Sequence, residues 1–264
     1  MKIRTSSGLL LQLGLLVFLT GRLSAAYFNW QEYHGNGLGG GTIGNGTLQM
    51  SNTISTVRGV FTKGPGTFGD SLVIFVDTVP GGLTTTANLY NNANRMEIGV
   101  SGYKTSRSVA TFAPGFGADY AIVLGINDYT GVYKLVDDPG GPYIQQVRAP
   151  IYVNPKDNGN LPSYYFTFDW TDIGLTAANT NFFKFESTYV TSNGGRSLDS
   201  FEGLTGTAGF GSITFTNYDT YGVEPIPENA NTALAIFGGI VLSAVLIKQA
   251  RGASRSNQRQ ISVN

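Results

Sequence analysis

The stretch Leu72-Val73-Ile74-Phe75-Val76 decides the fold, because its apolar residues follow one another without a polar interruption. Most of them are β-branched or aromatic, which are the residue types that favour strands. An unbroken apolar run of this kind is typical of a strand that is buried on both faces. The turn residues Pro80-Gly81-Gly82 follow it. We therefore predict a central, fully buried strand over 72–77.

Ten further segments share this enrichment and are separated by Gly, Asn, Asp and Pro. In Phe183-Lys184-Phe185-Glu186 the residues alternate with period two, as expected where one sheet face meets solvent. The Gly-rich segment 34–46 is predicted to be a loop, and it lacks the Gly-Lys-Ser/Thr of a phosphate-binding loop. The pattern predicts an all-β fold, an antiparallel, jelly-roll-like β-sandwich. The ten segments are 46–51, 54–62, 95–101, 108–112, 120–125, 131–135, 144–151, 164–169, 182–191 and 212–217.

The charges are distributed unevenly along the chain. Its 264 residues have a formal net charge of zero and no cysteine, and 13% of them are charged. Segment 27–222 holds 15 of the 17 acidic residues but only 10 of the 17 basic ones, a net charge of −5. An acidic body argues against nucleic acid as a partner, because phosphate binding needs clustered Lys and Arg. The lack of cysteine excludes disulfides, thiol catalysis and cysteine-based metal sites.

The N-terminus has the three parts of a secretion signal. Lys2 and Arg4 precede an apolar run from Leu9 to Leu19, and the small residues Ser24-Ala25-Ala26 follow. We predict that 1–26 is a helical signal peptide, cleaved after Ala26, that directs export. The alternatives are an N-terminal membrane anchor or a buried helix, which the short apolar run disfavours.

The C-terminus contains a second apolar segment. Residues 232–247 carry no charge, and at 1.5 Å per residue they would form a helix of about 24 Å, enough for a thin membrane span. The basic residues Lys248, Arg251, Arg255 and Arg259 follow the segment, whereas acidic residues precede it. The positive-inside rule then predicts a single transmembrane helix with the tail 248–264 in the cytoplasm and the body outside. The alternative is a buried core helix of the folded body.

The sequence VEPIPEN at 223–229, followed by the apolar span and the basic end, resembles the PEP-CTERM sorting signal. Pro227 and Glu228 match the first two positions of the family's Pro-Glu-Pro motif, and Asn229 stands where the family has the second Pro. The resemblance implies export and membrane retention through the C-terminal helix. It also implies processing near Pro227-Glu228 by an exosortase-type membrane peptidase, which would be the main partner.

A second resemblance covers the body of the chain. The phrases FGDSLVIFVD at 68–77, VPGG at 79–82, FGADYAIVL at 116–124, YKL at 133–135 and FTFDWTDIGL at 166–175 occur in this order. Together they resemble the DOMON-like, carbohydrate-binding-module-like β-sandwich domains, which implies a sandwich that can bind sugars. The predicted organisation is a signal peptide at 1–26, an extracytoplasmic β-sandwich at 27–222 and a sorting tail at 223–264.

Sugar binding requires exposed aromatic rings with polar neighbours. The candidate ligand contacts are Trp170, Tyr129 and Tyr143, with Trp30, Tyr152 and Tyr164 as further candidates. The acidic residues Asp70, Asp77 and Asp119 lie at predicted strand ends, where carboxylates ligate Ca²⁺ or, more often, cap turns. No compact calcium-loop motif accompanies them, so we predict no metal site and no cofactor.

Nothing in the sequence points to catalysis. His34 is the only histidine, and no Gly-x-Ser-x-Gly motif presents a nucleophilic serine. No spacing of acidic residues points to paired catalytic carboxylates. We therefore expect a non-catalytic, exported protein of the cell surface or extracellular matrix that is associated with exopolysaccharide and binds carbohydrate. The alternatives are a secreted carbohydrate-active enzyme and a purely structural surface component.

Overall fold

A computed structural model describes residues 28–36, 41–89, 98, 108–125, 130–149, 151–176, 182–190 and 195–222. Contacts along the chain divide the protein into two compact units, Met1–Val223 and Glu224–Asn264, and every described residue lies in the first. The predicted signal peptide, the residues Pro227 and Glu228, and the predicted span 232–247 all lie outside the described residues. Within the described part of the chain, no helix is long and apolar enough to cross a membrane.

Strands make up nearly all of the regular structure. The one described helix is a short 3-10 helix, η1 (Trp170–Ile173), directly after β10. The strands are β1 (Phe28–His34), β2 (Thr47–Asn52), β3 (Thr56–Thr62), β4 (Ser71–Asp77), β5 (Ala110–Thr111), β6 (Tyr120–Gly125), β7 (Gly131–Val136), β8 (Tyr143–Arg148), β9 (Tyr152–Asn154), β10 (Ser163–Asp169), β11 (Phe182–Val190), β12 (Leu204–Gly206), β13 (Ile213–Phe215) and β14 (Asp219–Gly222).

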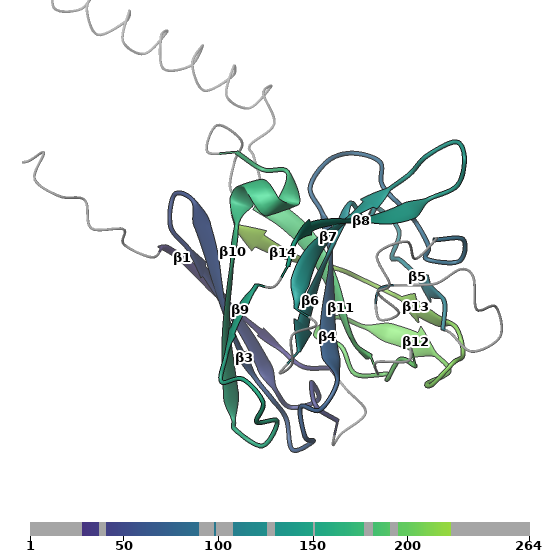
Figure 1. Cartoon of the computed structure of the whole chain (residues 1–264). Helices are drawn as coiled ribbons and strands as arrows, with labels where there is room; N and C mark the ends of the chain where they lie inside the picture. The colour runs from purple at the N-terminus through teal and green to yellow at the C-terminus, as the bar shows by residue number, and fades with distance from the viewer. Residues whose placement is uncertain are drawn as a thin grey trace, which may run out of the picture. The chain divides into compact units, whose positions relative to one another are not determined.

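These strands form three sheets, seen side by side in Figure 1. A five-stranded sheet has the order β1-β2-β3-β10-β9, and a six-stranded sheet has the order β14-β11-β4-β6-β7-β8. A small third sheet has the order β12-β13-β5. Neighbouring strands are antiparallel, except for the parallel pair of β13 and β5.

The two large sheets face each other across one apolar core. Alternate residues of each strand point into this core, as the pleat of a strand requires. Aromatic rings fill much of it, and Phe61 packs edge-on against Phe68 with 5.2 Å between ring centroids. The core includes Leu48, Val57, Phe61, Tyr164, Phe166 and Phe168 from the five-stranded sheet, and Leu72, Ile74, Val76, Ile122, Phe183 and Phe185 from the six-stranded sheet.

The six-stranded sheet is buried on its other face as well. Val73 and Phe75 of β4 belong to a second apolar cluster with Phe112 and with Phe215 of the third sheet. The ring centroids of Phe75 and Phe112 lie 4.8 Å apart. The prediction of a central strand buried on both sides is therefore confirmed.

The all-β, sandwich-like fold is confirmed, but some details differ from the prediction. The predicted strands 108–112 and 212–217 shorten to β5 and β13. The predicted strand 95–101 lies outside the described residues apart from Ile98. Strands β1, β9, β12 and β14 and helix η1 were not predicted. The third sheet adds a layer that a simple jelly-roll-like sandwich does not have.

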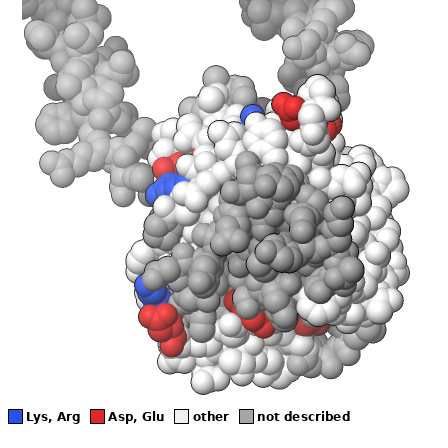
Figure 2. All heavy atoms as spheres, turned by 45° about the vertical axis from the view of Figure 1, so that its right-hand side comes forward, with Lys and Arg blue, Asp and Glu red and all other residues white. Residues whose placement is uncertain are grey.

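Figure 2 shows the molecule with the side of the third sheet turned forward. Among the described residues visible there, charged side chains are few, some of opposite charge lie side by side, and uncharged residues predominate. Seen from this side, the described surface offers no continuous basic patch of the kind that binds nucleic acid.

Candidate functional site

The outer face of the five-stranded sheet gathers exposed aromatic and polar side chains. Tyr33, Tyr164 and Val153 point into the core, so their neighbours along each strand point outward. We call this outer surface the aromatic face, and it consists of Trp30, Glu32, Gln49, Arg58, Val60, Tyr152, Asn154, Tyr165 and Thr167.

Three aromatic residues of this face are open to solvent. Trp30 on β1 is 61% exposed, Tyr152 on β9 is 62% exposed and Tyr165 on β10 is 40% exposed. The guanidinium of Arg58 lies 5.2 Å from the centroid of the Tyr165 ring, a cation–π arrangement that holds the ring in place. Exposed large aromatic rings on a stable sheet are a common feature of binding surfaces.

Strand pairing fixes how these rings are arranged. Tyr165 pairs with Asn154 on β9 and with Val60 on β3, and Tyr152 lies two residues from Asn154, diagonally across from Tyr165. Trp30 lies on the opposite edge strand, three strands from Tyr165, where the pairing of β1 with β2 is irregular between Phe28 and Gln31. At about 4.8 Å between strands, this is a distance of about 14 Å. Tyr152 and Tyr165 are therefore neighbours at one edge of the sheet, and Trp30 stands at the opposite edge, so an extended ligand would have to cross the strands to contact all three rings.

The polar groups between the rings suit a ligand rich in hydroxyls. Gln49 and Asn154 carry amides that can donate and accept hydrogen bonds, and Thr167 carries a hydroxyl. The Nε2 of Gln49 donates to Glu32 at 2.5 Å, so the amide and the carboxylate form one polar unit. Rings that stack and amides that hydrogen-bond are the elements of sugar recognition.

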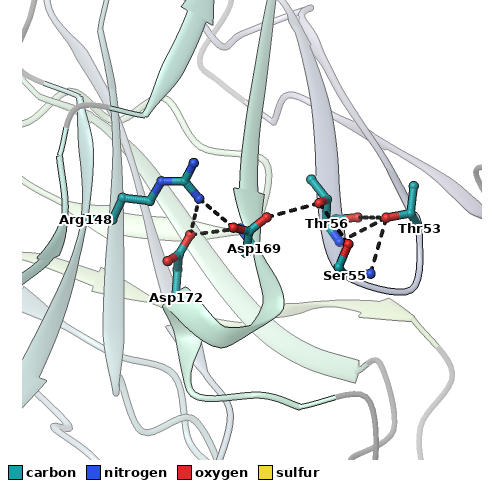
Figure 3. Close-up of polar contacts among 6 residues, drawn as sticks. All are labelled: Thr53, Ser55, Thr56, Arg148, Asp169 and Asp172. Atoms are coloured by element: carbon teal, nitrogen blue, oxygen red, sulfur yellow. Dashed lines mark hydrogen bonds and ion pairs between the residues drawn. The ribbon is translucent and has the colours of Figure 1, made fainter. Parts of the chain in front are cut away.

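An ion-pair network lies where β10 ends beside the start of β3 (Figure 3). Arg148, the last residue of β8, donates from Nη1 to Asp169 at 2.9 Å and to Asp172 at 2.8 Å. Asp169 ends β10, and its Oδ1 accepts a hydrogen bond of 3.0 Å from the hydroxyl of Thr56, its partner on β3. Hydrogen bonding to Asp172 and the charges of both carboxylates raise the pKa of Arg148. The network links an edge strand of the six-stranded sheet to the five-stranded sheet.

Short-range hydrogen bonds make this end of the sheet rigid. The backbone N–H of Asp169 donates to Asp172 at 2.8 Å, which fixes the start of η1. In the turn between β2 and β3, the hydroxyl oxygen of Thr53 accepts hydrogen bonds from the backbone N–H groups of Ser55 at 3.3 Å and Thr56 at 3.0 Å. Arg148 pairs with both carboxylates, so Asp169 and Asp172 are held in place and the network supports the face.

Of the three aromatic residues predicted first as ligand contacts, the two that the structure describes do not lie on the aromatic face. The prediction that Trp170 contacts a ligand is wrong, because its side chain is 1% exposed and packs in the core against Phe183 and Tyr221. Its Nε1 donates to the carbonyl of Thr53 at 3.3 Å, so its polar atom is also used internally. Tyr143 is half-buried at the start of β8, in the other large sheet. Tyr129 lies outside the described residues.

The further candidates divide into exposed and buried residues. Trp30 and Tyr152 lie on the aromatic face, whereas Tyr164 is 1% exposed and belongs to the core. Its neighbour Tyr165 is the exposed residue of the pair and was missed. The alternation of Tyr164 with Phe166 and Phe168 would have identified Tyr164 as buried.

The three acidic calcium candidates do not form one site. Asp70 precedes β4 and Asp77 ends it, so about 23 Å of extended strand separates them. The Oδ2 of Asp119 accepts hydrogen bonds from the backbone N–H groups of Thr78 at 2.8 Å and Val79 at 3.0 Å. Among the described residues, no group of three His, Cys, Asp or Glu side chains is arranged to hold a metal ion.

Two buried carboxyls were not predicted. Glu186 on β11 is fully buried, and burial is the main cause that raises its pKa to about 8. Glu202 is 1% exposed, and burial raises its pKa well above the ordinary value. Its Oε2 accepts hydrogen bonds from the backbone N–H of Ser187 at 2.8 Å and from the hydroxyl at 2.9 Å. Neither carboxyl can contact a substrate, because neither is accessible to solvent.

Comparisons of the chain with known proteins found no match. No protein-family model matches the chain, and no curated protein or solved structure is significantly similar to it.

Proposed function

We propose that the folded body is a non-catalytic module that binds neutral polysaccharide through the aromatic face. The observation that supports this most strongly is the placement of three exposed aromatic rings on one sheet face, with amide and hydroxyl groups between them. A pyranose ring has an apolar side that stacks on an aromatic ring, and its hydroxyls are satisfied by neighbouring amides. The resemblance to DOMON-like, carbohydrate-binding modules points to the same ligand class.

We propose further that this module belongs to an exported, membrane-sorted protein. Residues 1–26 would direct export, and 232–247 would anchor the chain in the inner membrane. An exosortase-type peptidase would then process the tail near Pro227-Glu228. The body would be presented at the cell surface or in the extracellular matrix, where exopolysaccharide is the abundant partner. This part of the proposal rests on the sequence patterns of the two ends.

A binding role is favoured over a carbohydrate-active enzyme by the state of the carboxyls. A glycosidase needs two carboxyl groups that both reach the substrate. Asp169 and Asp172 are held by Arg148, and Glu186 is inaccessible. A purely structural role would not explain why large aromatic rings are exposed to solvent on the aromatic face.

The test is binding of the full-length protein to polysaccharides. Affinity electrophoresis through gels that contain a β-glucan, a xylan or a mannan should retard the wild-type protein. Tyr152→Ala and Tyr165→Ala each remove one ring, and each should weaken the retardation about tenfold, because loss of one stacking contact costs about 1.5 kcal/mol.

The matched control is Phe210→Ala. Phe210 is 47% exposed but lies beside the third sheet, on the other side of the six-stranded sheet. This variant should bind as the wild type does. Equal binding by the Tyr152 and Tyr165 variants, or no retardation by any neutral polysaccharide, would refute the proposed site.

A further inference from the structure

We propose that Lys184 and Asp77 form an isopeptide bond, a covalent cross-link between β11 and β4. The two residues are direct partners in the antiparallel pairing of these strands. The Nζ of Lys184 lies 3.4 Å from the Oδ2 of Asp77. An amine and a carboxyl held this close need only a small movement to react, because the pairing of the two strands already fixes their relative positions.

The surroundings orient both reacting groups. The Nζ of Lys184 donates to the carbonyl of Gly115 at 2.7 Å and lies 4.9 Å from the centroid of the Tyr218 ring. The backbone N–H of Gly117 donates to the Oδ2 of Asp77 at 3.2 Å. This N–H points at the oxygen that gains negative charge when an amine adds to the carboxyl carbon. It therefore acts as an oxyanion donor.

Water has limited access to the pair. The side chain of Lys184 is 26% exposed and that of Asp77 only 10%. Burial raises the pKa of the Asp77 carboxyl, although Gly117 and Lys184 act in the opposite direction. A raised pKa favours the neutral carboxyl, which accepts a nucleophile more readily than a carboxylate does.

Glu186 supplies the acid and base for the reaction. It follows Lys184 by two residues on β11, so both side chains lie on the same face of the strand. Its Oε1 accepts a hydrogen bond of 3.0 Å from the backbone N–H of Ala113, so all three side chains contact the segment 113–117. Its Oε2 is buried and has no hydrogen-bond partner in the structure. With a pKa raised by burial to about 8, Glu186 holds a proton at neutral pH.

The reaction is a condensation that releases one water and needs no other reactant. The ammonium of Lys184 first passes one proton to the carboxylate of Asp77, which gives a neutral amine and a neutral carboxyl. The Nζ of Lys184 then attacks the Cγ of Asp77, and the new C–N bond gives a tetrahedral intermediate. Glu186 donates its proton to the departing oxygen, the C–O bond breaks, and water leaves. Glu186 then takes the second proton from the nitrogen and returns to its neutral state. The ammonium and the carboxylate have become an amide and a water molecule.

Peptide mapping of the full-length protein tests the bond. Trypsin, used after denaturation, does not cut at a lysine whose amine is acylated. The wild-type protein should therefore yield segment 64–95 joined to segment 157–196, lighter by one water than the two peptides together. Fragmentation should locate the link at Asp77 and Lys184. Free 64–95 with complete cleavage after Lys184 would overturn the proposal, whatever the variants do.

Variants test the roles of the residues. Lys184→Arg keeps the charge but cannot form the bond, so it should release unlinked 64–95, whereas Lys134→Arg, the control, should leave the cross-link intact. Glu186→Gln should slow formation of the bond by at least about tenfold, since general acid–base catalysis contributes that much or more. A cross-link that forms equally fast in Glu186→Gln would overturn the role of Glu186. The aromatic face contributes no residue to this site, so these outcomes are independent of polysaccharide binding.

Discussion

Glu186→Gln should change how the stability of the protein depends on pH. The Glu186 side chain is fully buried, and its pKa is raised to about 8 by burial, with a further contribution from the charge of Asp77. Gln has nearly the same volume, stays neutral at every pH and keeps an oxygen that can accept the hydrogen bond from Ala113. Both proteins in the comparison carry Lys184→Arg, so that the proposed cross-link forms in neither.

The sign and size of the effect follow from the two pKa values. In the unfolded chain Glu186 should titrate at its ordinary pKa of 4.5, whereas in the folded protein it keeps its proton up to about pH 8. The stabilisation from this group is therefore complete below pH 4.5 and is lost as the pH rises through 8. Each pKa unit is worth about 1.4 kcal/mol, so Glu186 alone should lower the free energy of unfolding by roughly 3–4 kcal/mol between about pH 5 and pH 8.

Urea unfolding, followed by the fluorescence of the buried Trp170, measures this free energy at each pH. The Gln variant should gain on its parent as the pH rises, by roughly 3–4 kcal/mol in total between about pH 5 and pH 8. Glu202 also titrates at a raised pKa, but it is present in both proteins and cancels in the difference. A difference between the two proteins that stays constant across this range would show that Glu186 is ionised in the folded state, and the reasoning would fail.

Two further changes test the packing and the two ends of the chain. In Gly59→Ala the added Cβ would lie 1.9 Å from the Cζ of Phe166, so the variant should lose about 1–3 kcal/mol of unfolding free energy in urea, and Phe166→Leu in the same chain should restore part of it. If the ends function as proposed, the intact mass of protein from the membrane fraction should correspond to loss of residues 1–26, and protein in the medium should also lack the tail beyond Pro227-Glu228. A mass that includes Met1 in both fractions would contradict export through a cleaved signal.

Local sequence patterns were sufficient to predict which side chains of a strand are buried where apolar residues recur regularly along it. The apolar run at 72–76 predicted a strand covered on both faces, and β4 has apolar clusters on both sides. The same logic applies to Tyr164-Tyr165-Phe166-Thr167-Phe168. Phe166 and Phe168 share a face with Tyr164, so the alternation predicts that Tyr165 is exposed, as observed. The exposed ring of the candidate site was therefore predictable from the sequence.

Other features depend on contacts between distant parts of the chain. β1 contains Asn, Gln, Glu and His, which are weak strand formers, and β14 is short. The two strands are held together by side chains: the backbone N–H of Gly222 donates to the Oε1 of Gln31 at 2.8 Å, and the Tyr33 hydroxyl donates to the carbonyl of Thr220 at 2.6 Å. No local pattern reveals such pairs. The same holds for Asp77 and Lys184, which become neighbours only through the order of strands in the sheet.

The distribution of charge favours a neutral over an acidic polysaccharide. Among the described residues of segment 27–222, 9 acidic and 6 basic side chains are not buried, a net charge of −3. This small negative charge gives no long-range attraction for an acidic polymer. On the aromatic face, the positive charge of Arg58 is set against the ring of Tyr165 and accompanied by the negative charge of Glu32.

Binding there must come from stacking and hydrogen bonds, which added salt screens little. Retardation should therefore persist in salt, and a preference for alginate that disappears as salt is added would point instead to ion pairing through Arg58.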